Sequence, residues 1–483
     1  MHKALTATLA FIPLAAAALA APALGATRAD AGNRAGESEF RELYKELIET
    51  DTALSNGSCT LAAERMAARL KAAGFPDADL HAFAAPGHPK EGGLVAFYPG
   101  SVPKLKAVLL LAHIDVVEAK RDDWTRDPFK LIEENGTFYA RGVIDDKAEA
   151  AIWVDTLIRY KQANYRPRRT IKLALTCGEE TAGAFNGAQW LAENQRDLID
   201  AAFAVNEGAF GELDAEGRKV ALEIQAGEKT AQNFRLEVTN PGGHSSRPLK
   251  DNAIYRLAAA LTRIEGYEFP AQFTDGNRAY FAGMAKIQAA KGNTEVADAM
   301  RALIKNPNDA AAIALVSAKD PSWNATLRTT CVATMLEAGH ATNALPQRAR
   351  ANINCRIFPG VTQEAVRLKL EELVSDPKVV VATLEIRGPS SPPPPLTSQI
   401  LAPFEKLAAE FFPGVPVLPI LQPGATDGEF LNAAGIPTYG IEPLFAGPDL
   451  GHIHGLNEYI SVKSLLDCRD FLYRLVKVYA DQK

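Results

Sequence analysis

Polar clusters that could bind metal ions or move protons stand at intervals along the chain. Five of them are His113-Ile114-Asp115, Arg141–Lys147, Glu179-Glu180, Asn206-Glu207-Gly208 and His454–Glu458. The apolar runs Val108–Ala112, Lys172–Thr176 and Ala201–Val205 each end in one of these clusters. In open α/β sheets, ligands gather at the carboxyl edge, where the strands end. We therefore expect these side chains to converge on one edge of a sheet.

The donor types in these clusters favour a pair of divalent cations. Isolated charges at a partly buried edge are costly to remove from water. Carboxylates and neutral imidazoles are ligands that divalent metals prefer. Two histidines with three or four carboxylates form a mixed nitrogen and oxygen set, which suits zinc and leaves cobalt or manganese open.

The clusters occur in a defined order, together with one further glycine-histidine motif. In chain order they read His113-x-Asp115, Arg141-Gly142-x-x-Asp145-Asp146-Lys147, Glu179-Glu180, Asn206-Glu207-Gly208, Gly242-Gly243-His244-Ser245-Ser246 and His454-Gly455-x-Asn457-Glu458. This set resembles the co-catalytic di-zinc metallopeptidase family of aminoacylase, glutamate carboxypeptidase and succinyl-diaminopimelate desuccinylase, over about residues 40–480. The stretch Asn324–Gly360 looks closest to its Gly-X carboxypeptidase and secreted N-acyl-amino-acid hydrolase branch.

The resemblance implies a role for each cluster. The implied metal ligands are His113, Asp145, Glu180, Glu207 and His454. Asp145 would bridge the two zinc ions, and Asp115 would orient the ring of His113. Glu179 would be the general base, because a nearby carboxylate can take the proton of a metal-bridged water whose pKa the cations lower.

The resemblance also implies three residues that contact the substrate. His244 would donate a hydrogen bond to the oxyanion of the tetrahedral intermediate, often from the other subunit of a homodimer. Arg356 would hold a substrate carboxylate, which its guanidinium matches with two parallel hydrogen bonds. Asn343 would assist Arg356. The alternatives without a function are that His244 is a loop histidine, Arg356 a surface cation and Asn343 a turn residue.

Some neighbouring residues leave alternatives open. His452 lies two residues before His454, and the H-G-x-N-E context favours His454 as the ligand. Asp427 either shapes the pocket or caps a helix. Cys177 is expected to be packed, not nucleophilic, and Ala140 stands where the family usually has glycine. The chain has no G-x-S-x-G and no H-E-x-x-H, which argues against a serine hydrolase and a single-zinc protease.

An α/β scaffold must position these residues. From Ser38 to about Glu228, helical patterns alternate with short all-apolar runs. Helices are expected at Leu43–Leu54, Leu61–Ala73 and Ala148–Tyr160, and strands at Ala107–Ala112, Ile171–Thr176 and Ala201–Val205. Such runs are typical of a mainly parallel sheet sandwiched by helices. The pattern returns after Thr397 and ends in a helix at Val462–Tyr479.

Between about Glu228 and Thr397 the pattern of apolar and polar residues differs from that of the α/β parts. Alternating strands are expected at Phe234–Val238, Ala325–Glu337, Arg348–Phe358 and Val379–Ile386, and helices at Ala253–Ile264 and Gln363–Val374. This order predicts a smaller inserted α+β domain with one face of its sheet available for contact. The resemblance implies that this domain serves as a lid and dimerisation domain. The expected division is a catalytic domain at 38–229 and 391–483 with the insertion at 230–390. The role of the spacer at about 265–323 stays open.

Residues 1–26 predict a secretory signal peptide. A basic start precedes the apolar run Ala4–Leu24, and small residues at Ala23–Ala26 resemble a cleavage site. An uncleaved membrane anchor is the alternative, which Pro13 and Pro22 disfavour. We expect a periplasmic or secreted protein with no membrane contact after cleavage.

Composition excludes other classes. The chain has 483 residues, 47% of them hydrophobic, and its 52 Lys+Arg against 58 Asp+Glu give a net charge of -6. Without a dense basic tract, nucleic-acid binding is disfavoured. Five cysteines without a CxxC pair exclude a zinc finger. In an oxidising compartment Cys331 and Cys355 could pair. Because the number of cysteines is odd, at least one thiol stays free.

These observations predict a secreted di-zinc hydrolase that cleaves an amide bond next to a free carboxylate. The substrate would be a peptide C-terminus or an N-acyl amino acid, attacked by metal-bridged hydroxide, with Glu179 passing a proton to the leaving amine. Glu207, where relatives can have Asp, favours the carboxypeptidase and deacylase side. The alternatives are a dipeptidase or aminoacylase of the same fold and a non-catalytic binding relative.

Overall fold

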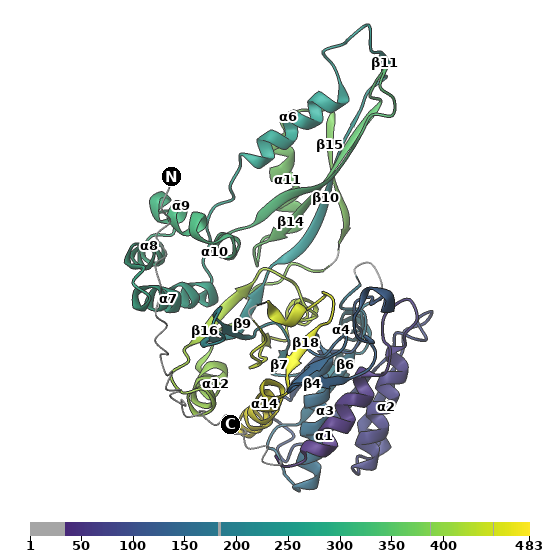
Figure 1. Cartoon of the computed structure of the whole chain (residues 1–483), viewed down its shortest axis with the longest axis vertical. Coiled ribbons are helices and arrows are strands. Elements are labelled where there is room, and N and C mark those ends of the chain that lie inside the picture. Colours follow the sequence, from purple (N-terminus) through teal and green to yellow (C-terminus); the bar gives the residue numbers. More distant parts are fainter. Residues whose placement is uncertain (1–33, 182–184, 387, 448) are drawn as a thin grey trace, which may run out of the picture. The chain divides into compact units, whose positions relative to one another are not determined.

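A computed structural model of the chain describes residues 34–181, 185–386, 388–447 and 449–483 (Figure 1). The predicted signal peptide at 1–26 lies outside the described residues. The chain divides into an N-terminal unit, Met1–Glu37, and a main unit, Ser38–Lys483, which contains every sheet of the described residues. No described helix is long and apolar enough to cross a membrane.

The larger sheet of the main unit has nine strands. Their order is β1 (Leu80–Phe83), β2 (Gly93–Tyr98), β6 (Ile171–Thr176), β3 (Val108–His113), β7 (Phe203–Asn206), β17 (Thr438–Gly440), β9 (Lys219–Glu228) and β16 (Val417–Gln422), with β8 (Gly211–Leu213) paired to β9. The central neighbours β6, β3, β7 and β17 run parallel, and so do β9 and β16. The strands β1 and β2 pair antiparallel at one edge. The predicted α/β class is confirmed.

Helices cover both faces of this sheet, which explains why its central strands are apolar throughout. Val108 and Leu110 of β3 pack into one core cluster, and Leu109 and Leu111 pack into another. The first cluster includes residues of α1 (Glu37–Ile48), α2 (Cys59–Ala72), α3 (Lys147–Gln162), α12 (Ser398–Phe411) and α14 (Val462–Asp481). The second includes residues of α4 (Gly187–Asn194), α5 (Arg196–Ile199) and α13 (Gly428–Ala433).

The smaller sheet has four antiparallel strands and helices on one face. Its order is β12 (Thr330–Ala338), β14 (Arg348–Ile357), β10 (Thr230–Thr239) and β15 (Val379–Ile386). Alternate residues of β10 and β14 pack against α6 (Ala253–Glu265) and α11 (Gln363–Val374). Such alternation is typical of a sheet with one open face. The strand β12 is an edge strand and is exposed along most of its length.

The spacer before β12 folds into four helices that pack on the larger sheet. They are α7 (Asp275–Ala290), α8 (Thr294–Lys305), α9 (Ala310–Lys319) and α10 (Pro321–Leu327). Phe281 and Met284 share a core cluster with Ala221 of β9 and Leu418 of β16. Part of the span predicted as an insertion, 230–390, therefore packs against the larger sheet, on strand β9, which precedes the span in sequence, and strand β16, which follows it.

One predicted strand begins too early. Residues 325–327 belong to α10, and β12 starts only at Thr330. The helix starts because the side chain of Asp320 accepts a hydrogen bond from the backbone N–H of Ser322 at 2.7 Å, and Pro321 occupies the first helical position.

Four of the five cysteines form disulfides. Cys331 of β12 pairs with Cys355 directly opposite on β14. Cys59, at the start of α2, pairs with Cys177, just after β6. Cys468 is a free, buried thiol in α14. The second pairing was not expected from the sequence, where 118 positions separate its two cysteines.

Candidate metal centre

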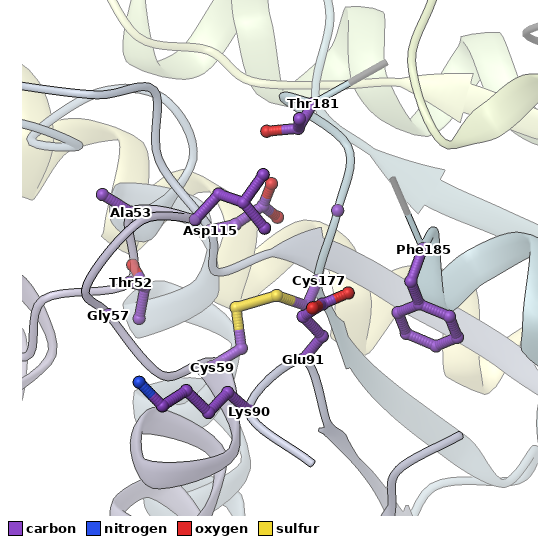
Figure 2. Close-up of a pocket in the computed structure, with 12 residues that line it drawn as sticks. Thr52, Ala53, Gly57, Cys59, Lys90, Glu91, Asp115, Cys177, Thr181 and Phe185 are labelled. Atoms are coloured by element: carbon purple, nitrogen blue, oxygen red, sulfur yellow. A yellow bond between two sulfur atoms is a disulfide. The ribbon is translucent and has the colours of Figure 1, made fainter. Parts of the chain in front are cut away.

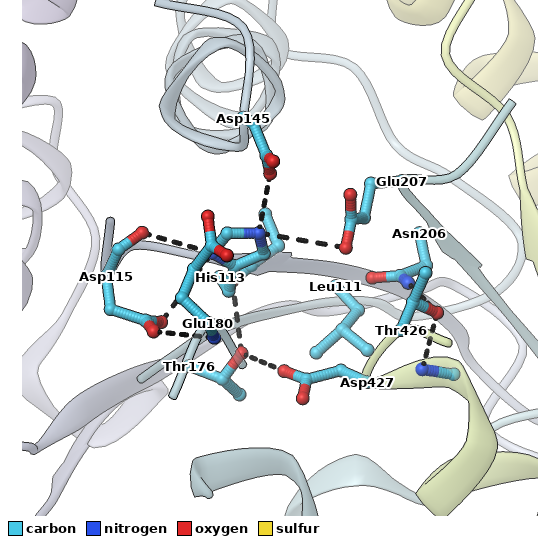
Figure 3. Close-up of polar contacts among 12 residues, drawn as sticks. Leu111, His113, Asp115, Asp145, Thr176, Glu180, Asn206, Glu207, Thr426 and Asp427 are labelled. Carbon is cyan, nitrogen blue, oxygen red and sulfur yellow. Dashed lines mark hydrogen bonds and ion pairs between the residues drawn. The ribbon is translucent and has the colours of Figure 1, made fainter. Parts of the chain in front are cut away.

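The predicted metal ligands come together at the carboxyl edge of the larger sheet. His113 ends β3, Glu180 follows β6 and Glu207 follows β7, whereas Asp145 lies just before α3 and His454 lies before β18 (Tyr459–Ser461). The predicted base, Glu179, also follows β6. Figure 3 shows His113, Asp145, Glu180 and Glu207 pointing toward one another.

The carboxylate of Asp145 lies between the two imidazoles. One oxygen, Oδ1, is 3.0 Å from Nε2 of His113, and the other, Oδ2, is 3.0 Å from Nε2 of His454. A carboxylate with one oxygen turned toward each of two ligands can serve two cations at once. This is the arrangement that the predicted bridging role of Asp145 requires.

The remaining carboxylates flank this centre on two sides. Glu180 lies 2.9 Å from Nε2 of His454, and Glu207 lies 3.7 Å from Nε2 of His113. Two overlapping groups have ligand atoms within 4.8 Å of one another: His113 with Asp145 and Glu180, and His113 with Glu179 and Glu207. Ligand atoms that share a zinc ion at ~2.0–2.1 Å lie roughly 3.4 Å apart, close to these separations.

Asp115 fixes the ring of His113. The ring atom Nδ1 lies 3.1 Å from the backbone carbonyl oxygen of Asp115 and 3.6 Å from its Oδ1. Because these oxygens can only accept, Nδ1 must carry the hydrogen, and Nε2 faces Asp145. The other oxygen, Oδ2, accepts the backbone N–H of Glu180 at 3.0 Å. Asp115 therefore positions one histidine and one carboxylate of the centre.

The centre carries an excess of negative charge. Burial, and then the charge of Asp145, raises the pKa of both Glu207 and Glu180. Burial and the Glu207 charge raise the pKa of Glu179 well above its usual value. Hydrogen bonds with Asp145 and Glu180 raise the pKa of His454 to about 10. The residues fit a pair of divalent cations, whose charge would balance four carboxylates next to two neutral imidazoles.

A buried ion pair locks two of the predicted motifs together. Glu458, which is fully buried, accepts hydrogen bonds from Arg141 Nη1 at 2.8 Å and from the backbone N–H of Gly142 at 2.9 Å. Its other oxygen accepts the N–H groups of Ile144 at 2.9 Å and Asp145 at 3.3 Å. The H-G-x-N-E motif thus holds the loop that carries Asp145, a role that sequence reasoning missed.

Two residues left open by the sequence are placed by their contacts. Nε2 of His452 lies 2.8 Å from Asp449, within its own loop, whereas His454 faces the centre. Asp427 precedes α13 but makes no side-chain cap. Its buried carboxylate instead accepts hydrogen bonds from Thr176 (Figure 3) and from Asn186, on either side of the Glu179 segment.

The three residues predicted to contact the substrate lie within residues 230–390, the predicted insertion. His244 lies on β11 (Gly243–His244), which pairs with β13 (Ala344–Leu345), directly after Asn343. Both side chains are exposed, and the carbonyl of Asn343 accepts the N–H of Ser245. Arg356 lies on β14, half-buried. The structure thus brings His244 and Asn343 together, and their roles stay predictions.

The fold and the centre together define a metal-dependent hydrolase on a mainly parallel sheet. The model of peptidase family M20/M25/M40 matches residues 109–478, and the chain belongs to this family. Among curated relatives, the human N-fatty-acyl-amino acid synthase/hydrolase PM20D1 is 31% identical over 388 residues, which cover 78% of this chain and 75% of the relative.

Solved structures share the fold. An M20 family metallo-carboxypeptidase, Sso-CP2 from Sulfolobus solfataricus, aligns with a TM-score of 0.66 at 19% identity, over 92% of this chain and 99% of its own. The YXEP protein of Bacillus subtilis, a dinuclear metal-binding peptidase of the M20 family, aligns with a TM-score of 0.58 at 13% identity, over 92% and 99%.

Proposed function

We propose that this hydrolase cleaves the amide bond next to a free carboxylate, in N-acyl amino acids or at peptide C-termini. The observation that carries the proposal is the placement of Asp145: its Oδ1 lies 3.0 Å from the imidazole of His113, and its Oδ2 lies 3.0 Å from the imidazole of His454. The relative that acts on N-fatty-acyl amino acids and the neighbour described as a carboxypeptidase support this substrate class.

Two zinc ions, or cobalt or manganese ions, would be held by His113, Asp145, Glu180, Glu207 and His454. When bound, such cations polarise a carbonyl and lower the pKa of water. Glu179 is the general base: it takes a proton from the attacking water and gives it to the nitrogen of the leaving amine. Asp115 keeps His113 in the tautomer that the centre needs.

His244 is suited to donate to the developing oxyanion. The backbone N–H of Ser246 points at Nδ1 of His244, 3.2 Å away. Because Nδ1 accepts this hydrogen bond, the neutral ring carries its hydrogen on Nε2, which is free to act as a donor. Arg356 holds the substrate carboxylate with Asn343 beside it, as a planar guanidinium can form two parallel hydrogen bonds.

We extend the proposal to a homodimer in which the inserted domain, 230–390, acts as lid and dimer contact. The edge strand β12 exposes Val332, Met335 and Leu336 at 59%, 71% and 66%. An exposed apolar edge strand is a ready partner for another strand. Met335→Asp should therefore yield a monomer in sedimentation, and a dimer that survives this change would contradict the use of this edge.

Export through a cleaved N-terminal signal completes the proposal, with a periplasmic or secreted enzyme as the result. The pattern in residues 1–26 and the two disulfides support it, because disulfides persist in oxidising compartments. N-terminal sequencing of the exported protein tests it: an intact residue 1 would contradict cleavage.

The decisive experiment is a matched substrate panel. Metal-loaded protein is assayed on N-acyl amino acids, their C-terminal amides and free dipeptides, with and without a chelator. We expect hydrolysis of the N-acyl amino acids with a free carboxylate, and not of their amides or of free dipeptides. This activity should be lost on chelation and restored by zinc. Faster cleavage of free dipeptides would assign the chain to the dipeptidases, and activity that survives full metal removal would overturn the metal mechanism.

A complementation assay tests whether His244 acts across the dimer. Glu179→Gln and His244→Ala subunits are each expected to be nearly inactive. A mixed dimer contains one site with both native residues only if His244 comes from the opposite subunit. Recovery of activity on mixing therefore supports the cross-subunit role, and no recovery in proven mixed dimers contradicts it.

A further inference from the structure

The segment that carries Glu179 and Glu180 has its two ends in contact, and we call this contact the neck of the segment. It leaves β6 at Cys177 and joins α4 at Gly187, where the backbone N–H of Gly187 donates to the carbonyl of Cys177 at 2.7 Å. Gly178 has φ +95°, and a Cβ there would lie 1.7 Å from the carbonyl oxygen of Phe185. The two ends of the segment are therefore in direct contact, and only glycine fits at this approach.

Asp427 ties both sides of this neck to one carboxylate. Its Oδ2 accepts the hydroxyl hydrogen of Thr176 at 2.8 Å (Figure 3), and its Oδ1 accepts a side-chain N–H of Asn186 at 2.7 Å. Thr176 is the last residue of β6, and Asn186 caps α4 through its own side-chain oxygen. Asp427 is only 1% exposed, so these bonds replace water that the carboxylate has lost.

The Cys59–Cys177 disulfide holds the same segment from another side. It links the first residue of the segment to the start of α2. Figure 2 shows this bond in the wall of a small cavity, of about 60 Å³, which Asp115 and Gly178 also line. Since Asp115 accepts the N–H of Glu180, the acidic pair is tethered next to a covalent link.

We propose that Asp427 and the Cys59–Cys177 disulfide are positioning groups for the hydrolysis, which hold Glu179 and Glu180 at the distance that proton transfer and metal binding require. The inference rests on the proposed roles of those two glutamates. A general base works only within hydrogen-bond reach of the proton it takes, and a misplacement of about 1 Å can lower a rate roughly 10²-fold. Neither positioning group needs to touch the substrate.

The test separates hydrogen bonding from charge at position 427. Asp427→Ala removes both contacts and should lower kcat about 10- to 100-fold, with KM changed less than about threefold. Asp427→Asn should restore most of kcat, because its oxygen can accept from Asn186 while its N–H donates to the Thr176 hydroxyl. If Asn were as damaging as Ala, charge and not position would be the cause, and the proposal would fail.

The disulfide is tested against its counterpart in the smaller sheet. Replacing Cys59 and Cys177 together by serine should lower kcat about 10-fold. The matched control replaces Cys331 and Cys355, which tie two strands of that sheet, and should leave kcat within about twofold. Equal effects of the two double variants on kcat would remove the special role of the first disulfide.

Hydrogen exchange keeps this inference distinct from the proposed function. In metal-loaded Asp427→Ala, peptides covering 176–181 should exchange faster than in the wild type, while peptides from β14 should not change. If the wild type hydrolyses no amide substrate but this local loosening occurs, the function is wrong and the positioning stands. Unchanged exchange together with unchanged kcat would overturn the positioning role.

Discussion

The candidate residues of the two sheets are held in different ways. On the edge of the larger sheet, Asp145 contacts both His113 and His454, and a buried ion pair fixes its loop. Beyond the smaller sheet, on the separate two-stranded pair β11 and β13, His244 is exposed and its ring bonds to Ser246, two residues away. The first set is preorganised by its own chain, whereas the second set presents donors that a substrate or a second subunit would engage.

This difference separates residues with a fixed geometry from residues that would gain their partners on binding. Preorganised groups stabilise a transition state without reorganising at the moment of reaction, and the metal-centre residues meet that condition. Exposed donors gain their partners only on binding. Variants in the larger sheet should therefore change turnover or metal content, and variants at Arg356 of the smaller sheet should change substrate affinity. His244, as the proposed oxyanion donor, should affect turnover once its partner is bound.

The largest expected effect is at the general base. Glu179→Gln should lower kcat by about 10²–10⁴-fold, because it removes proton transfer but keeps the size of the side chain. The metal content, measured by elemental analysis, should stay at two ions per chain. A loss of metal together with kcat would make Glu179 a ligand instead of a base.

A loss of stability should follow when the buried lock of the larger sheet is broken. Glu458→Ala leaves Arg141 and several backbone N–H groups buried without their acceptor, which should cost about 3–5 kcal/mol in the free energy of unfolding. Urea unfolding measures it. The control is Asp298→Ala, which breaks an exposed pair with Arg301 and should cost less than ~1 kcal/mol. Similar losses in both variants would contradict the lock.

A smaller effect, confined to affinity, should follow in the smaller sheet. Arg356→Ala should raise KM roughly 10-fold or more for substrates with a free carboxylate, since a charged hydrogen bond contributes about 1.5–3 kcal/mol. C-terminal amides should show no such change. Arg350→Ala is the matched control on the same strand, because Arg350 pairs with Glu237 at 2.7 Å. A KM change in the control as large as at Arg356 would remove the carboxylate clamp.

Much of the larger sheet and its edge could be predicted because local pattern and position agree there. The apolar run that ends at Thr176 was placed correctly, and the fold class follows from such runs. The polar clusters meet because the carboxyl ends of parallel strands share an edge. The site of a residue such as His113 can thus be read from where its strand stops.

What the sequence did not reveal depends on contacts between distant positions. The pairing of Cys59 with Cys177 spans 118 positions and carries no local signal. Asp427 has the position of a helix cap, and only tertiary contacts show that its side chain bonds to Thr176 and Asn186. The spacer helices were not predicted from the sequence, and their packing on β9 and β16 follows from the sheet order, which local sequence does not encode.

A pH-dependent change in stability is expected at the junction between the two sheets. Lys229, between β9 and β10, donates to the carbonyls of Ala325 and Arg328 and to the Thr330 hydroxyl. Burial, and then the charge of Arg356, lowers the pKa of Lys229 to about 7, against about 10.4 in an unfolded chain. Between these values the unfolded chain binds more protons, so the free energy of unfolding rises with pH.

One proton sets the size of that rise at up to about 1.4 kcal/mol per pH unit. The measurement is urea unfolding of the oxidised protein at pH 7.5, 8.5 and 9.5, for the wild type and for Lys229→Met. The variant lacks the titrating group, so its stability should rise less steeply than that of the wild type. The difference in slope is the quantity tested, because any loss of hydrogen bonds shifts the variant equally at every pH. Equal slopes would mean that Lys229 stays charged at this junction, and that the two sheets are joined there by an ion, not by a neutral amine.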